Sequence, residues 1–167
     1  MAVGIDVGST NTKVVAIDEN GHILAQAERP LATMAAQPGW VEQDPLAMFA
    51  NVVGAANEVL QKAGARAADV AGLGIANQTE TIVVWDRHTG EPAMPAMVWQ
   101  CRRGAAEIAP LAGSADMVRA RTGLDLDPTF SAAKLKWLFA NRPDIARGLR
   151  EGALLFGTVD TWLVWKL

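Results

Sequence analysis

Nine consecutive residues near the start of the chain gather an acid, a glycine, three hydroxyl groups and a cation: Ile5-Asp6-Val7-Gly8-Ser9-Thr10-Asn11-Thr12-Lys13. These residue types suit the outer phosphates of a nucleotide. Glycine lets backbone N–H groups approach a phosphate, hydroxyl groups donate hydrogen bonds, and Lys13 neutralises charge. Asp6 ends an apolar run and could hold Mg²⁺ directly or through water, since that ion keeps several waters. The alternative is an ordinary polar hairpin turn that Asp6 caps.

Two nucleotide-binding motifs are excluded by the spacing. A Walker A loop requires G-x-x-x-x-G-K-[ST] before a helix, and the segment around Gly8 does not have it. The pair Gly72 and Gly74 lacks the third glycine of a dinucleotide-binding fingerprint. Any phosphate site at residues 5–13 is therefore of another kind.

Composition narrows the class of protein. The chain has 167 residues and a formal net charge of -3, which argues against nucleic acid or an anionic membrane as the main partner. One cysteine and two histidines exclude a disulfide framework and a zinc site built from cysteines or several histidines. The first residues lack the pattern of a signal peptide, and no apolar run reaches the ~20 residues of a membrane span. We therefore expect a cytoplasmic protein without membrane contact.

The elements that must position the turn are readable from local patterns. Apolar runs at 2–7, 12–18 and 22–29, separated by turn residues, predict three antiparallel strands. Residues 30–43 are expected to form a loop. Asp44 followed by Pro45 predicts the start of a helix, and Gly64 lies where its C-terminal cap belongs. We expect an apolar stripe on that helix: Leu46, Phe49, Val52, Val53, Ala56, Val59 and Leu60.

The rest of the chain mixes strand and helix patterns. Extended segments are expected at 70–76, 81–85, 97–100 and 153–156. Helical segments are expected at 101–109, 114–121, 131–140 and 143–149, followed by a last helix that ends inside an apolar segment. Such a mixture indicates an α/β layered domain. Because no cap or polar tail closes the last segment, we expect the chain to be part of a longer protein.

Several blocks together resemble one protein family. The turn at residues 5–13 resembles the first phosphate motif of the sugar kinase, actin and Hsp70 superfamily. The other blocks are similar to glycerol kinases of the FGGY family of carbohydrate kinases, in order from Val3 to the last residue: 38–45 (PGWVEQDP), 77–81 (NQTET), 98–103 (VWQCRR), 122–124 (TGL), 134–137 (KLKW) and 155–162 (LFGTVDTW). The resemblance implies an α/β fold of the ribonuclease H-like type. Its mixed sheet would start with three antiparallel strands and be flanked by helices, in truncated form.

The resemblance also implies ATP and Mg²⁺ as cofactors of a kinase that phosphorylates a polyol or sugar hydroxyl. Asp6 matches the acid near the metal, and the phosphates would lie beside Gly8, Ser9, Thr10 and Lys13. Glycerol kinases have arginine where this chain has Lys13, which keeps the charge but loses the two-pronged geometry.

The implied substrate site consists of five residues: Gln78, Thr79, Glu80, Trp99 and Thr129. Glu80 matches a carboxylate that accepts hydrogen bonds from substrate hydroxyls, and Trp99 matches an indole that packs on the carbon chain. Core packing and a solvated loop are the alternative roles of these two residues. Glycerol kinases have arginine in place of Thr79 and tyrosine in place of Thr129. Because both changes remove hydrogen-bond donors and open space, we expect a larger polyol or a sugar to compete with glycerol.

The family pattern further implies that residues 1–167 are the N-terminal portion of the substrate-binding domain. The rest of that domain, the nucleotide domain and the catalytic base would lie beyond Leu167, so the chain alone is expected to be inactive. Its partners would be a small substrate and the missing C-terminal half, with a homo-oligomer left open. The alternative is a non-catalytic actin-like module that binds a ligand or partner protein.

Arg102 and Arg103 are expected on the surface of a helix. They could form ion pairs there or steer an anionic ligand, and both roles are left open. Cys101 is expected to be structural.

Overall fold

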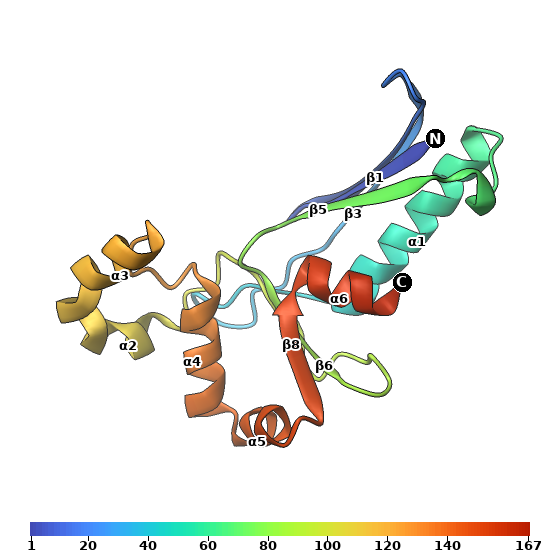
Figure 1. Cartoon of the computed structure of the whole chain (residues 1–167). Coiled ribbons are helices and arrows are strands. Elements are labelled where there is room, and N and C mark those ends of the chain that lie inside the picture. The colour runs from blue at the N-terminus through green and yellow to red at the C-terminus, as the bar shows by residue number, and fades with distance from the viewer.

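The computed structural model describes residues 1–167 and contains two four-stranded sheets (Figure 1). The first sheet has the strand order β3-β2-β1-β5. Its strands are β1 (Ala2–Val7), β2 (Asn11–Ile17), β3 (Ile23–Pro30) and β5 (Gly72–Asn77). The first three strands are antiparallel, and β5 pairs in parallel with β1. This confirms the expected mixed sheet and its three antiparallel opening strands.

The second sheet is antiparallel and has the order β4-β7-β6-β8. Its strands are β4 (Glu42–Gln43), β7 (Ala96–Met97), β6 (Ile82–Asp86) and β8 (Leu154–Thr158). The expectation of a continuous loop over residues 30–43 was wrong at β4. A two-residue strand has no periodicity of its own, and β4 exists because it pairs with β7.

Helix α1 (Pro45–Lys62) lies along one face of the first sheet (Figure 1). Its predicted start is confirmed, since the Asp44 side chain accepts a hydrogen bond from the backbone N–H of Leu46 at 2.9 Å. Gly64 follows the helix with a φ of 63°, a left-handed conformation that glycine adopts without a Cβ clash.

The buried face of α1 is rotated from the predicted stripe. Leu46 and Val53 are exposed, and the fully buried side chains are Met48, Val52, Ala55 and Val59. The prediction favoured the branched residues, whereas the helix turns a methionine and an alanine toward the closely approaching sheet.

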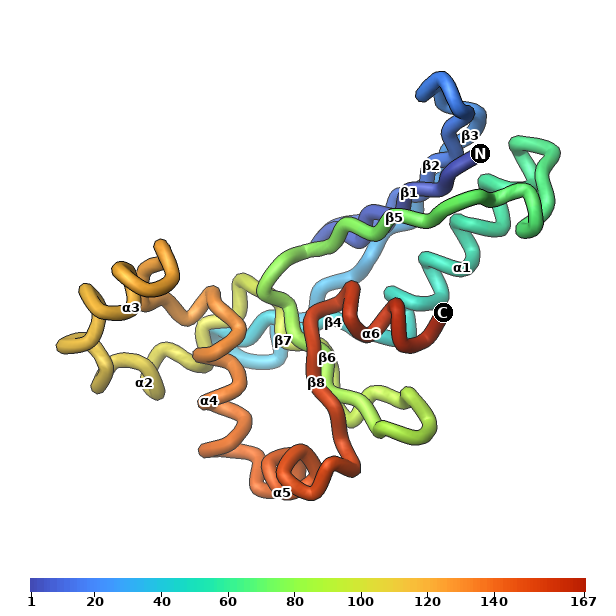
Figure 2. Tube along the Cα trace, in the orientation of Figure 1, coloured from blue at the N-terminus to red at the C-terminus, as the bar shows by residue number.

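The helices of the second half surround the second sheet and extend away from it. They are α2 (Ala105–Ile108), α3 (Ala115–Thr122), α4 (Ser131–Asn141), α5 (Pro143–Glu151) and α6 (Val159–Lys166), and two 3₁₀ turns span Ala67–Asp69 and Ala109–Ser114. The trace in Figure 2 shows α2 and α3 projecting from both sheets, and α6 lying between α1 and strands β6 and β8. None of these helices has the length and hydropathy that a bilayer crossing requires.

Strand β6 separates two apolar cores. Val83 and Trp85 belong to the larger core, which also contains the buried faces of the first sheet, α1 and α6. Ile82 and Val84 belong to the smaller core, together with side chains of α4 and α5. Because side chains pack on both of its faces, β6 is a rigid strand, and it fixes the position of the loop that precedes it.

Candidate functional site

A cleft of about 410 Å³ joins the two groups of residues that the sequence singled out. It is lined by the turn between β1 and β2, by the loop between β5 and β6, by the segment after β7 and by the approach to α4. The lining residues are Gly8, Ser9, Asn77, Gln78, Thr79, Glu80, Trp99 and Thr129. Residues expected to face phosphate and residues expected to face a polyol therefore share one space.

The phosphate turn presents free hydrogen-bond donors. The Gly8 N–H donates to the Asn11 carbonyl at 2.9 Å and closes the turn, whereas the N–H groups of Ser9 and Thr10 donate to no protein acceptor. Consecutive free N–H groups in a turn form a concavity that attracts anions. Thr12 does not belong to this group, because its hydroxyl is fully buried under the sheet with no partner.

Asp6 and Lys13 lie outside the cleft. They are opposite each other in the β1–β2 ladder and line a neighbouring open concavity on the uncovered face of the first sheet. Lys13 pairs with Glu28 at 3.8 Å, and the Asp6 carboxylate has no protein partner. Thr10 lines neither space.

The donor set near the turn fits magnesium only in a phosphate-bound form. No three His, Cys, Asp or Glu side chains converge anywhere in the chain. Mg²⁺ is commonly held by one or two carboxylates, several waters and substrate phosphates. The exposed, unpaired Asp6 carboxylate fits that arrangement.

Glu80 is held in an uncommon conformation. Its φ of 65° is the only positive value at a non-glycine residue, and such backbone strain concentrates at functional sites. One carboxylate oxygen, Oε2, accepts hydrogen bonds from the backbone N–H and the hydroxyl of Ser131, both at 2.6 Å. Ser131 begins α4, so the helix N-terminus stabilises this oxygen. The other oxygen has no protein partner and remains available to a ligand.

Trp99 and Gln78 take different roles in the cleft wall. The Trp99 side chain lines the cleft and is 37% exposed, so its indole face is accessible to a ligand. Gln78 also lines the cleft, but its amide bonds the Gly8 carbonyl, Gln43 and Thr81. The Gln78 side chain is thus already engaged by the protein.

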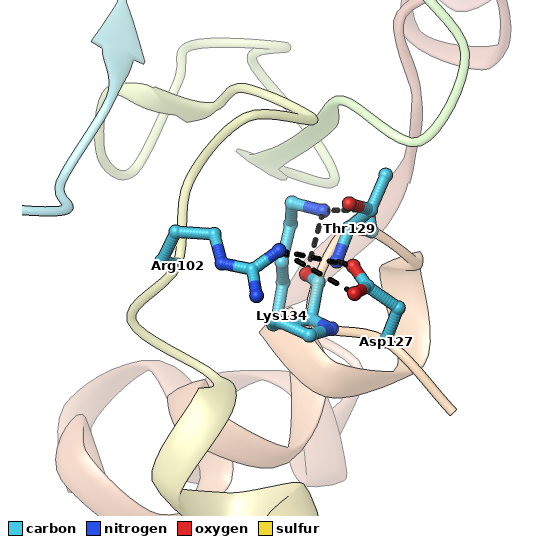
Figure 3. Close-up of polar contacts among 5 residues, drawn as sticks. Arg102, Asp127, Thr129 and Lys134 are labelled. Atoms are coloured by element: carbon cyan, nitrogen blue, oxygen red, sulfur yellow. Dashed lines mark hydrogen bonds and ion pairs between the residues drawn. The ribbon is translucent and has the colours of Figure 1, made fainter. Parts of the chain in front are cut away.

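Thr129 lies on a short turn that charged side chains secure (Figure 3). Its N–H donates to Asp127 at 2.8 Å, and Arg102 pairs with the same carboxylate at 3.2 Å. The hydrogen bonds from Thr129, aided by the Arg102 guanidinium, hold the pKa of Asp127 below its usual range. The Thr129 side chain is left at the cleft, where no larger side chain fills the space.

Beneath that turn lies the fully buried Lys134 of α4. Its ammonium donates to the carbonyls of Pro128 and Thr129 (Figure 3). Burial lowers the pKa of Lys134 to about 8, although the nearby carboxylates of Glu80 and Asp127 oppose that shift. An amine among apolar helix positions gives no signal of this role in the sequence.

The placement of Arg103 on a helix surface was wrong. Its guanidinium is buried, pairs with Glu42 of β4 at 2.6 Å and donates to the Cys101 sulfur at 3.0 Å. It also stacks over the Trp40 ring at 3.8 Å and lies 5.0 Å from the Trp137 ring. Arg103 therefore anchors the segment after Trp99 to β4 and α4, and cannot reach an anion in the cleft.

Ser131 and Asn77 belong to the site and were not predicted. Ser131 is the first residue of the predicted helix at 131–140, but its hydroxyl donates to Glu80 instead of capping the helix, so that position gave no signal of its role in the site. Asn77 gave no such signal, since only the parallel pairing of β5 with β1 brings it beside Val7 and the turn.

Comparison with known proteins gives a consistent result. The model of the N-terminal domain of the FGGY family of carbohydrate kinases matches residues 1–167. The glycerol kinase of Shewanella frigidimarina is 47% identical over 167 residues, which cover 99% of this chain and 34% of that protein. Glycerol kinase 2 of Pseudomonas aeruginosa is 46% identical over 167 residues, covering 99% and 33%. The chain thus spans about a third of the length of these curated relatives.

Solved structures agree with the fold. The crystal structure of Plasmodium falciparum glycerol kinase with ADP superposes with a TM-score of 0.90 at 30% identity, covering 99% of this chain and 34% of that one. Gluconate kinase from Lactobacillus acidophilus superposes with a TM-score of 0.86 at 21% identity, covering 99% and 32%, which supports the fold alone.

Proposed function

The chain belongs to the FGGY family of carbohydrate kinases, and from this premise we propose that its whole protein transfers the γ-phosphoryl group of ATP to a hydroxyl of a small polyol or sugar. The observation that carries the proposal is the shared cleft. Free turn donors at Ser9 open into the same space as the free Glu80 oxygen and the Trp99 indole. A donor phosphate and an acceptor hydroxyl bound there would be neighbours.

Each wall of the cleft supplies one part of the chemistry. The N–H groups of Ser9 and Thr10 would bind phosphate oxygens, because preorganised donors stabilise the charge that develops during phosphoryl transfer. Glu80 would accept hydrogen bonds from substrate hydroxyls, and Trp99 would cover the carbon chain. When bound, Mg²⁺ would neutralise phosphate charge, with Asp6 as its contact in this chain and Lys13 beside it.

We propose that the catalytic base and the nucleotide domain lie in the remaining part of the protein. The chain spans about a third of its relatives, and β5 presents an unpaired edge beside an apolar groove. The 167-residue chain alone is therefore expected to release no ADP above a blank. Since ATP is the proposed phosphoryl donor, we also propose the cytoplasm as the location.

We propose that the acceptor is larger than glycerol. Thr79 and Thr129 both line the cleft, and their short hydroxyl side chains do not extend as far into it as the arginine and tyrosine of glycerol kinases would. A site that discriminates through hydroxyl hydrogen bonds changes its preference strongly when those partners change.

The test is ADP release by the full-length protein with Mg-ATP and a panel of glycerol, tetritols, pentitols and ketoses. We expect a tetritol, pentitol or ketose to give the highest kcat/KM, and the double variant T79R/T129Y to shift preference toward glycerol. Glycerol leading the panel in the unchanged protein would contradict the larger acceptor. If no compound in the panel supports ADP release and circular dichroism shows an intact fold, the kinase function is contradicted and a binding module is favoured.

A further inference from the structure

A continuous chain of buried hydrogen bonds runs beneath the cleft, from the phosphate turn to the indole wall. Its three side chains are Gln43 of β4, Gln78 after β5 and Thr81 before β6, which we call the amide relay. Gln43 and Thr81 are fully buried, and Gln78 is 7% exposed. Of these three residues, only Gln78 lines the cleft.

The first half of the amide relay binds the phosphate turn. The Gln43 Nε2 donates to the Ser9 carbonyl at 2.7 Å and to the Thr33 hydroxyl at 3.0 Å. The Gln78 Nε2 donates to the Gln43 Oε1 at 2.7 Å and to the Gly8 carbonyl at 3.3 Å. The Gly8 and Ser9 carbonyls are therefore both bound by the relay.

The second half reaches the wall of the cleft. The Thr81 hydroxyl donates to the Gln78 Oε1 at 3.1 Å and accepts from the Trp99 backbone N–H at 3.0 Å. The ends of the relay define its polarity, because the Gly8 and Ser9 carbonyls that it meets can only accept and the Trp99 backbone N–H can only donate. Each amide can satisfy this pattern in one orientation only, since a flip would place its oxygen against a carbonyl.

The relay connects elements that no backbone ladder connects. Gly8 and Ser9 extend from the first sheet, whereas Gln43, Thr81 and Trp99 belong to the second sheet or its connections. Hydrogen bonds in a buried, low-dielectric place are strong when complete and costly to leave unmade. The relay thus holds the two sheets at one separation directly below the cleft.

We propose that Gln43, Gln78 and Thr81 are positioning residues, which set the distance between the bound phosphate and the acceptor hydroxyl. This inference rests on the proposed kinase function. In-line transfer needs the reacting atoms about 3–3.5 Å apart, and a misplacement of about 1 Å can lower the rate by about 100-fold. Since the relay touches the walls rather than the ligands, its loss should impair the transfer step more than the binding of either substrate.

Two fully buried threonines provide a matched test in the full-length protein. Thr81→Val removes the hydroxyl that joins Gln78 to Trp99, whereas Thr12→Val removes a buried hydroxyl without a partner. We expect T81V to lower kcat by about 10- to 100-fold, with each KM within about threefold of the unchanged protein. T12V should keep kcat within about twofold, and Thr81→Ser, which retains the hydroxyl, should recover most of the activity.

A second variant guards against misfolding of the first. Gln43→Met keeps the length of the side chain but removes the amide, so it breaks the relay at the phosphate turn and should lower kcat in the same way. Unchanged kcat in folded T81V and Q43M would overturn the relay alone, as would equal losses in T81V and T12V. Absence of transfer by the unchanged protein would instead overturn the proposed function, and the relay's role with it.

Discussion

Strands β5 and β6 follow one another in the chain, and the loop that joins them, residues 78–81, supplies three of the eight residues that line the cleft. Their surroundings differ completely. Residues 82–85 of β6 are all buried between two cores, whereas none of the residues of β5 is fully buried. Parallel strands are normally covered on both faces, and β5 is parallel to β1 yet remains open.

The difference teaches how the site is supported. Close packing of β6 fixes the adjacent end of the loop, so Glu80 and Thr81 are held in defined positions. The other end of the loop is attached to β5, a strand with a free edge and small residues that leave room for another segment to pack against it. A Cβ placed on Gly72 or Gly74 would meet nothing within 4 Å, so packing within this chain does not explain either glycine.

The largest effect is expected at Trp85, the largest buried side chain of β6. Trp85→Ala should lower the free energy of unfolding of the 167-residue chain by about 3–5 kcal/mol, because it removes a large side chain from the larger core. Leu73→Ala on β5 is the control, and should cost less than about 1 kcal/mol because that side chain is 51% exposed. Denaturant titration of both variants measures these free energies. Equal losses of unfolding free energy in the two variants would contradict the proposed difference between β6 and β5.

A smaller effect is expected from the buried amine below the cleft. Burial lowers the pKa of Lys134 from 10.5 to about 8, so between these values the unfolded chain binds more protons than the folded chain. The free energy of unfolding should therefore rise with pH across this window, by on the order of 2–3 kcal/mol.

The variant that isolates this contribution is Lys134→Met, which removes the titrating group. Its unfolding free energy should lose that rise between pH 8 and 10.5, whatever the variant costs at neutral pH by leaving the Pro128 and Thr129 carbonyls without a donor. Urea titrations at several pH values measure the slope. The same rise in the variant would show that another group causes it.

The smallest effect changes sign with what covers β5. In the 167-residue chain, Gly74→Ala should raise the free energy of unfolding by about 0.5–1 kcal/mol, since alanine loses less conformational entropy and the space is open. In the full-length protein, the same variant should be destabilising where the remaining part of the protein packs against β5. Thermal melts of the variant and the unchanged sequence, in the 167-residue chain and in the full-length protein, measure both effects. Stabilisation in both proteins would mean that this face of β5 stays uncovered.

Elements with strong local signals were predicted well. The three antiparallel strands, the start of α1 at Asp44 and the start of α4 near Ser131 follow from turn residues, caps and apolar spacing. Strands β6 and β8 match the extended segments predicted at 81–85 and 153–156, but their assembly with β4 and β7 into a second sheet was not predicted, because β4 and β7 have two residues each and exist only through pairing. Short strands of this kind carry no periodicity that a sequence could show.

The candidate site divides in the same way. Residue types in the turn singled out Gly8 and Ser9, and the family resemblance implied Gln78, Thr79, Glu80, Trp99 and Thr129; the structure brings all seven to one cleft. It separates Asp6 and Lys13 from them, because alternate residues of a strand face opposite sides and these two side chains turn to the uncovered face. Spacing along a strand gives such alternation but not which side the cleft occupies.

The sequence by itself determined the local features: the glycine turn that leaves two N–H groups free, the capped helix and the family to which the chain belongs. Only the tertiary structure decided that Arg103 is buried against Glu42, that Lys134 lies under the Thr129 turn, and that Gln43 connects the turn to the cleft wall. The physical reason is the distance along the chain between the interacting groups. Turns and caps are satisfied by neighbours within a few residues, whereas a buried charge or amide is satisfied only by partners that distant segments bring to it.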